Sequence, residues 1–149
     1  MSTAYVVDTT ILMQSVLEDT NTKRAQSLLY MALDASNVIL HIPEFAMIEC
    51  GNVLWKQVRF HDETAENVQR VFQDLRAFPL IKHRSEHLLP RALEIGLAQG
   101  LAVYDCVHIA LAERLNCPLI TVDVRQANAA QTASVPLKPI TDFPEYTSD

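Results

Sequence analysis

Residues 4–17, AYVVDTTILMQSVL, carry the pattern on which the fold prediction depends. The run AYVV (4–7) is short, apolar and rich in strand-forming residues, which is typical of a buried strand. The run TTILMQSVL (9–17) follows with the apolar spacing of a helix. Asp8 stands between the two, directly after the strand. The stretch therefore predicts a strand–helix unit with an acid at its junction.

The same alternation continues along the chain and predicts the fold class. Further strands are predicted at 37–42, 78–83 and 117–123, and the run 135–140 is a possible last strand whose prolines favour a sheet edge. Pro43 is expected in the first turn of its helix, and Pro90 at the start of a regular helix. Strands that alternate with helices predict an α/β fold with a mostly parallel sheet of four to five strands and helices on both faces. The helices are predicted at 9–17, 23–35, 43–60, 62–77, 85–99, 101–115 and 124–133.

Composition limits the class of protein. With 149 residues and no visible repeat or linker, the chain is predicted to be a single domain over residues 1–149. The formal net charge of −6 argues against a generally basic nucleic-acid surface, but it leaves room for a local one. No apolar run reaches the length of a membrane span, and the first residues lack the pattern of a secretory signal. The three cysteines lie in apolar segments, so we expect buried thiols and a cytoplasmic protein.

Four acids lie in or beside apolar sequence, at places that a parallel sheet would bring close together. Asp8 and Asp123 each follow a predicted strand, and the carboxyl ends of parallel strands form the functional crevice of such sheets. Glu49 lies on a narrow polar stripe of a helix whose other faces are apolar. Asp105 lies near the start of a helix, where the helix dipole favours a negative charge. We therefore expect these four carboxylates to converge.

A cluster of carboxylates suits a hard cation such as Mg²⁺ or Mn²⁺. Such a cation can polarise a phosphate, lower the pKa of a bound water and stabilise a leaving oxygen. Without a cation, clustered carboxylates would repel one another and some would protonate. Asp105 taken alone is better explained as a helix cap, so the metal hypothesis depends on the four acids together.

Four segments carry a more specific signal: VVDTTIL (6–12), PEFAMIECGNVLWK (43–56), GLAVYDCVHIALAERL (100–115) and CPLITVDVR (117–125). In this order and spacing they resemble the PIN-domain ribonucleases, and especially the VapC-type toxins, over residues 5–140. The resemblance implies a three-layer α/β/α sandwich, hydrolysis of RNA phosphodiester bonds that depends on Mg²⁺ or Mn²⁺, homodimers, and inhibition by a cognate antitoxin protein. The acids of the family match the four acids above, which would be both catalytic and metal-binding: Asp8, Glu49, Asp105 and Asp123.

Polar residues near these acids are candidates for supporting roles. Thr10, Asn52 and Thr121 could each hold a carboxylate or a bound water, although ordinary structural roles explain them equally well. Three basic residues close to the acids in sequence are possible RNA contacts: Lys56, Arg59 and Arg125. Gln14 stands where the family often has a basic residue, and Cys106 replaces the usual alanine after the third acid.

Several alternatives remain open. His83 and His87 are four residues apart and could bind zinc, but the local sequence offers no further ligands. His108, one turn after Asp105, is expected to pack or bond locally. A non-toxin RNA-processing nuclease would share the same acids. A catalytically silent module that binds RNA or protein would be expected to have lost one or more of them.

Overall fold

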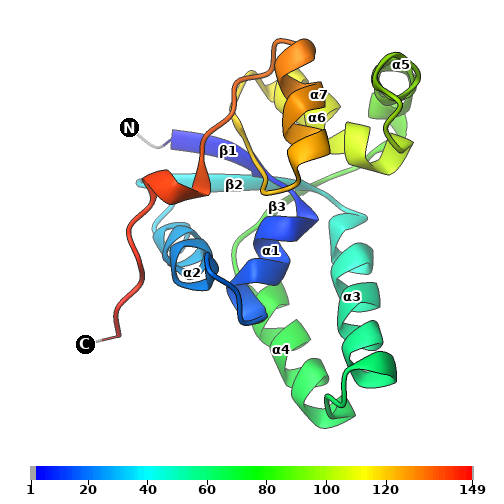
Figure 1. Cartoon of the computed structure of the whole chain (residues 1–149). Coiled ribbons are helices and arrows are strands. Elements are labelled where there is room, and N and C mark those ends of the chain that lie inside the picture. The colour runs from blue at the N-terminus through cyan, green and yellow to red at the C-terminus, as the bar shows by residue number, and fades with distance from the viewer. Residues whose placement is uncertain (1–2, 149) are drawn as a thin grey trace.

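The computed structural model describes residues 3–148, so Met1, Ser2 and Asp149 of the predicted domain lie outside the described residues. Figure 1 shows the order of the elements along the chain. The strands are β1 (Thr3–Val7), β2 (Val38–Pro43), β3 (Ile81–His83) and β4 (Leu119–Ile120). The helices are α1 (Thr9–Val16), α2 (Thr22–Met31), α3 (Ala46–Phe60), α4 (Ala65–Ala77), α5 (Leu89–Gln99), α6 (Val103–Leu115) and α7 (Val124–Thr132), with short 3₁₀ turns η1 (Glu86–Leu88) and η2 (Ile140–Asp142).

The sheet confirms the predicted α/β class. Its strand order is β3-β2-β1-β4, and all three pairings are parallel. Successive strands run outward from β1 to β2 and β3, and the chain then crosses to the other side of β1 to form β4. The order therefore reverses between β1 and β4, and this is the point where ligands bind in open parallel sheets.

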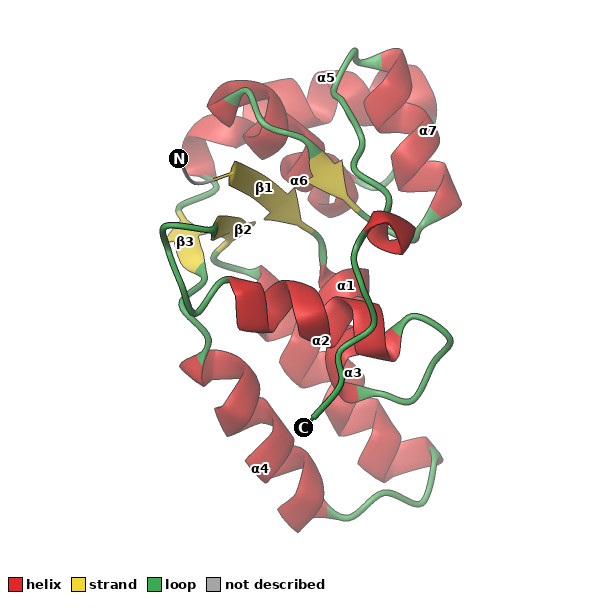
Figure 2. Cartoon of the chain, turned by 90° about the vertical axis from the view of Figure 1, so that its left-hand side faces the viewer, coloured by secondary structure: helices red, strands yellow, loops and turns green. Residues whose placement is uncertain are grey.

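Two apolar cores, one on each face of the sheet, hold the three layers together. Figure 2 shows the sheet between α5, α6 and α7 on one side and α1, α2, α3 and α4 on the other. Alternate residues of β1 point into different cores: Tyr5 and Val7 pack against the α1–α4 side, whereas Val6 packs against the α5–α7 side. The seven consecutive residues 106–112 of α6 are all buried, so α6 is a central helix rather than a surface one. The predicted three-layer sandwich is confirmed.

Several predicted boundaries are wrong. β3 covers only Ile81–His83 of the predicted strand 78–83, and β4 covers only Leu119–Ile120 of the predicted strand 117–123. α4 begins at Ala65 rather than at residue 62, and α6 begins at Val103 rather than at residue 101.

Three further boundaries are wrong for a local reason. Pro43 ends β2 instead of opening a helix, because the last position of a strand tolerates a residue without an N–H, and α3 begins only at Ala46. The run 135–140 makes one isolated bridge, between Leu119 and Leu137, since its prolines cannot donate to a ladder. α2 ends at Met31 rather than at residue 35, and Ser36 then donates from its backbone N–H and its hydroxyl to the Asp34 carboxylate.

Two histidines share a hydrogen bond on the β2–β3 side of the sheet. His41 Nδ1 and His83 Nε2 lie 2.8 Å apart, and both side chains are half-buried. Burial lowers the pKa of each imidazole below its ordinary value of 6.5, and the neighbouring histidine lowers it further: His83 for His41, and His87 for His83. The unfolded chain therefore binds these protons more readily than the folded one. This pair costs no stability above pH 6.5 and destabilises the fold progressively below it.

We expect His83→Gln to weaken this dependence on pH. The variant should lose about 1 kcal/mol at pH 7, where the hydrogen bond is intact, and should fall less than the parent between pH 7 and pH 5. Urea denaturation at the two pH values measures the difference. His61→Gln, at the exposed C-terminal end of α3, is the matched control. An equal fall in the parent and in His83→Gln would contradict the assignment.

Within residues 3–148, no single helix is both long and apolar enough to cross a membrane. Two consecutive segments are long and apolar enough only when taken together, and the chain bends by 118° between them: Glu86–Gln99 and Val103–Leu115.

Candidate active site

The four predicted acids come from four elements near the reversal point of the sheet. Asp8 follows β1 and caps the N-terminus of α1, and Asp123 follows β4 and caps the N-terminus of α7. Glu49 and Asp105 lie in the first turns of α3 and α6. Because helix N-termini carry a partial positive charge, each of these places favours a carboxylate.

Asp8 is the most buried of the four acids and is held by three hydrogen bonds. Its side chain is 3% exposed. Its Oδ1 accepts from the Thr10 hydroxyl at 2.6 Å and from the Ile11 backbone N–H at 3.2 Å, and its Oδ2 accepts from the Thr121 hydroxyl at 2.5 Å. The carboxylate is therefore fixed in orientation by residues that follow both β1 and β4.

The two threonines also fix the loop that leads to Asp123. The Thr10 hydroxyl oxygen accepts from the Val122 backbone N–H at 3.3 Å, and the Thr121 hydroxyl oxygen accepts from the Asp123 backbone N–H at 3.0 Å. Each hydroxyl thus donates to Asp8 and accepts from the chain after β4. The structure places Thr10 and Thr121 between two of the acids.

Glu49 is held through one of its two oxygens. The Thr9 hydroxyl donates to Glu49 Oε1 at 2.7 Å, and His108 Nε2 lies 3.5 Å from the same oxygen. The His108 ring is 2% exposed and makes an edge-to-face contact with Phe45, with ring centroids 5.6 Å apart. Both contacts use Oε1, and no other residue within 3–148 forms a hydrogen bond with the second Glu49 oxygen, so this oxygen is available to a ligand.

Burial and nearby charges shift the pKa of two of the acids, Asp105 and Asp8. Burial raises the pKa of Asp105 most, and the negative charges of Asp123, Glu49 and Asp8 raise it further, against the effect of His108. Burial also raises the pKa of Asp8, against the lowering effects of His108 and of its hydrogen-bond donors. The other three acids are therefore close enough to Asp105 to disfavour its ionised form.

The cysteines near the acids are not candidate nucleophiles. Burial and the charges of Glu49 and Asp8 raise the pKa of the Cys50 thiol to about 12. Burial and the charge of Asp105 raise the pKa of the Cys106 thiol to about 11. Since the thiolate is the reactive form, both side chains stay protonated and unreactive near neutral pH.

The donor set fits a hard divalent cation, although it does not form a ready ligand cage. Its donors are carboxylate oxygens, which Mg²⁺ and Mn²⁺ prefer. Among residues 3–148, however, no three His, Cys, Asp or Glu side chains lie close enough to hold a metal ion. The carboxylates would have to move toward one another when a cation binds.

An open cavity adjoins Glu49 and contains one of the possible RNA contacts. Its volume is about 530 Å³, and its wall includes Glu49, Asn52, Lys56 and Tyr104. Asn52 is exposed and lies on this wall. Tyr104, next to Asp105 in sequence, is 58% exposed.

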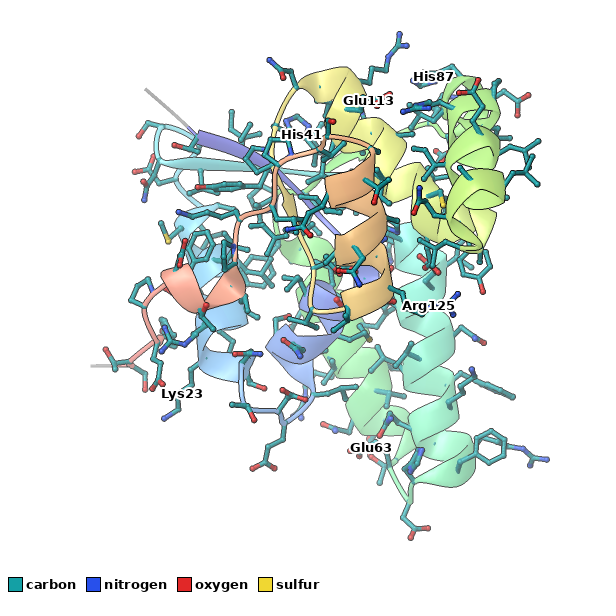
Figure 3. All side chains as sticks on the ribbon, turned by 45° about the horizontal axis from the view of Figure 1, so that its top comes forward. Lys23, His41, Glu63, His87, Glu113 and Arg125 are labelled. Atoms are coloured by element: carbon teal, nitrogen blue, oxygen red, sulfur yellow. The ribbon has the colours of Figure 1, made fainter. Side chains whose placement is uncertain are left out.

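The other two basic candidates have protein contacts of their own. Arg59 is exposed, and its guanidinium lies 5.9 Å from the ring centroid of Phe60. Arg125, labelled in Figure 3 at the start of α7, is exposed but donates from Nη2 to the Gly100 carbonyl oxygen at 2.8 Å. Arg125 therefore has a structural contact that sequence did not reveal.

Three residues have contacts at this site that the sequence did not predict, and one of them, His108, was expected only to pack or bond locally. Thr9 binds Glu49, His108 lies among the acids, and Gln126 contacts Asp105. For His108 the signal was present, because a polar residue one helical turn after Asp105 shares its face of the helix. The roles of Thr9 and Gln126 depend on contacts between elements far apart in sequence.

Comparison with known proteins identifies the family of this chain. The sequence model of the PIN domain matches residues 5–131. Ribonuclease VapC3 of Pyrobaculum aerophilum is 31% identical over 88 residues, which cover 56% of this chain and 66% of VapC3, just under two thirds of its length. Ribonuclease VapC9 of Mycobacterium tuberculosis is 30% identical over 92 residues, which cover 62% of this chain and 71% of VapC9.

Solved structures share the fold at low sequence identity. PAE2754 from Pyrobaculum aerophilum superposes with a TM-score of 0.70 at 20% identity, over 95% of this chain and 94% of that one. VapBC2 from Rickettsia felis, bound to a DNA fragment from their promoter, gives a TM-score of 0.64 at 13% identity, over 91% and 98%. The family match spans most of the chain, and the fold agrees with it: the chain belongs to the PIN domain family, and the relatives to which it is similar are VapC ribonucleases.

Proposed function

We propose that this protein is an endoribonuclease that hydrolyses RNA phosphodiester bonds with the help of Mg²⁺ or Mn²⁺. The observation that supports it best is the set of four acids, from four elements, at the reversal point of a parallel sheet. Burial, and then the charges of Asp123, Glu49 and Asp8, raise the pKa of Asp105, as expected of a site that a cation completes. The names of the VapC ribonucleases support RNA as the substrate.

Different side chains at the site would bind the cation, orient its ligands and contact the RNA. Asp8, Glu49, Asp105 and Asp123 would hold the cation, directly or through water. When bound, the cation supplies positive charge that stabilises the phosphate oxygens and the leaving oxygen. Thr10 and Thr121 orient Asp8, while Thr9 and His108 orient Glu49. The exposed basic residues Lys56, Arg59 and Arg125 would contact the phosphate backbone.

Removal of divalent cations is the direct test of this function. The purified chain, incubated with total cellular RNA, should cleave it in Mg²⁺ or Mn²⁺ and should lose this activity in EDTA. Mapping the ends of the fragments identifies the RNA that is cut. Cleavage that persists in EDTA, or a parent that does not cleave in either cation, would contradict the proposal.

We also propose that the nuclease is the toxin of a toxin–antitoxin pair, inhibited by a cognate antitoxin protein. The support is the similarity to VapC ribonucleases and the fold shared with a VapBC2 structure. The genes beside this one distinguish a toxin from an RNA-processing nuclease. A small adjacent upstream gene for a DNA-binding protein favours the toxin, and a neighbourhood without such a gene favours the other role.

A homodimer is the expected assembly. Several large apolar side chains are exposed on α3 and α5, which lie on the same side of the molecule in Figure 1. Ile48 on α3 is 75% exposed and Leu97 on α5 is 78% exposed. A second copy could cover this surface, because exposed apolar patches often mark interaction sites. Light scattering after gel filtration should give twice the mass of the chain, and a monomer at micromolar concentration would contradict the expectation.

A further inference from the structure

Gln126, in the first turn of α7, contacts two of the acid residues at once. Its side chain is 1% exposed. Its Nε2 donates to the backbone carbonyl oxygen of Asp105 at 2.8 Å, and its own backbone N–H donates to Asp123 Oδ1 at 3.2 Å. One buried residue therefore connects the start of α6, which carries Asp105, with the carboxylate of Asp123.

The orientation of the Gln126 amide follows from this contact, since only the NH₂ group can donate to a carbonyl oxygen. Its Oε1 is consequently buried and has no hydrogen-bond partner among residues 3–148. A buried carbonyl without a partner is unfavourable, and an apolar side chain of the same size would avoid it. Unsatisfied buried groups of this kind call for an explanation, and a functional role is one.

Arg125 makes a parallel connection on the exposed side of the same turn. Its Nη2 donates to the Gly100 carbonyl oxygen at 2.8 Å, and its backbone N–H donates to Asp123 Oδ1 at 2.9 Å. Gly100 ends α5 in the left-handed conformation, with φ of 63°, and the turn it forms leads directly into α6. We call the two side-chain bonds, from Arg125 to Gly100 and from Gln126 to Asp105, the α6–α7 clamp.

We propose that Gln126 is a positioning residue that fixes the Asp105 carboxylate relative to that of Asp123, and so sets the affinity of the site for a divalent cation. This inference depends on the proposed function. A cation such as Mg²⁺ requires near-ideal coordination geometry, so binding weakens when two of its ligands are not held in a fixed relative position. Residues that orient the ligands of a metal typically change its affinity by about 10–100-fold when they are replaced.

Gln126→Met separates this role from a merely structural one. Methionine fills a similar volume, removes the bond to Asp105 and also removes the unsatisfied Oε1. We expect the Tm of the metal-free variant to equal or exceed that of the parent, while its Kd for Mn²⁺, measured by calorimetric titration, rises about tenfold or more. A residue that only supports packing would lower stability and cation affinity together.

Gln131→Met, the same substitution at an exposed position of α7, is the matched control and should bind Mn²⁺ like the parent. Equal Mn²⁺ affinity in Gln126→Met and the parent would overturn the positioning role of Gln126 but not the proposed function. A parent that does not bind Mn²⁺ would contradict the proposed function itself. If Gln126→Met does not fold, Gln126→Leu, which also removes the bond to Asp105 and leaves Arg125 in place, decides: a severalfold rise in Kd supports the inference, and an unchanged Kd overturns it.

Discussion

Asp105→Asn is expected to lower the rate of RNA cleavage at saturating Mg²⁺ by about 10²-fold or more, the loss typical when one charge-stabilising group leaves an active site. The same change should raise the Tm of the metal-free protein. Burial and the charges of Asp123, Glu49 and Asp8 disfavour the ionised form of Asp105, and asparagine carries no charge. The Tm would thus rise while the cleavage rate falls. This trade-off between stability and activity is expected of a site whose charged side chains are arranged to bind a ligand.

Cleavage assays and thermal unfolding on the same preparations measure both effects. Asp74→Asn, an identical substitution at an exposed position of α4, is the control and should leave both quantities at the parent's values. If Asp105→Asn cleaved RNA as fast as the parent, Asp105 would have no part in catalysis. If it were also less stable than the parent, Asp105 would serve only as a first-turn acid of α6.

Leu111→Ala is expected to destabilise the protein by about 2–5 kcal/mol, because it leaves a cavity in the core between α6 and the sheet. Leu111 is 0% exposed and belongs to the core on the α5–α7 side. For a chain of this length, the loss corresponds to a fall in Tm of roughly 4–20 °C. Denaturant titration of parent and variant measures it.

Leu33→Ala is the control for this second prediction. Leu33 follows α2 and is 59% exposed, outside the surface proposed for the dimer, so its truncation should change the free energy of unfolding by less than about 0.5 kcal/mol. Equal losses in the two variants would contradict the central place of α6 in the fold.

The architecture could be predicted from sequence because its signals are local. AYVV has the pattern of a buried strand, and TTILMQSVL has the apolar spacing of a helix. Asp8, between them, lies where β1 ends and α1 begins. One predicted boundary is wrong where an interaction with a distant segment outweighs the local sequence pattern. Pro43 suits the first turn of a helix, yet it pairs in register with His83 in the sheet. Pairing between strands is decided by segments distant in sequence, and a local pattern does not reveal it.

The same distinction holds for the candidate site. The four acids could be predicted because each has a local context, a strand end or a helix start. The hydroxyl of Thr9 on Glu49 joins residues 40 positions apart, and the amide of Gln126 on Asp105 joins residues 21 positions apart. Neither contact produces a regular pattern in the sequence from which it could be predicted. Arg125 was predicted only as an RNA contact, and the structure adds a bond to Gly100.

A crystal structure of the protein grown with Mn²⁺, with anomalous diffraction from the ion, tests the central claim most directly. Our account predicts an anomalous peak about 2.1–2.2 Å from carboxylate oxygens of Asp8 and Asp105, with Glu49 and Asp123 in contact with the ion directly or through water. No peak at that place in a structure with Mn²⁺ at saturating concentration, or a peak held by other residues such as His41 and His83, would contradict it.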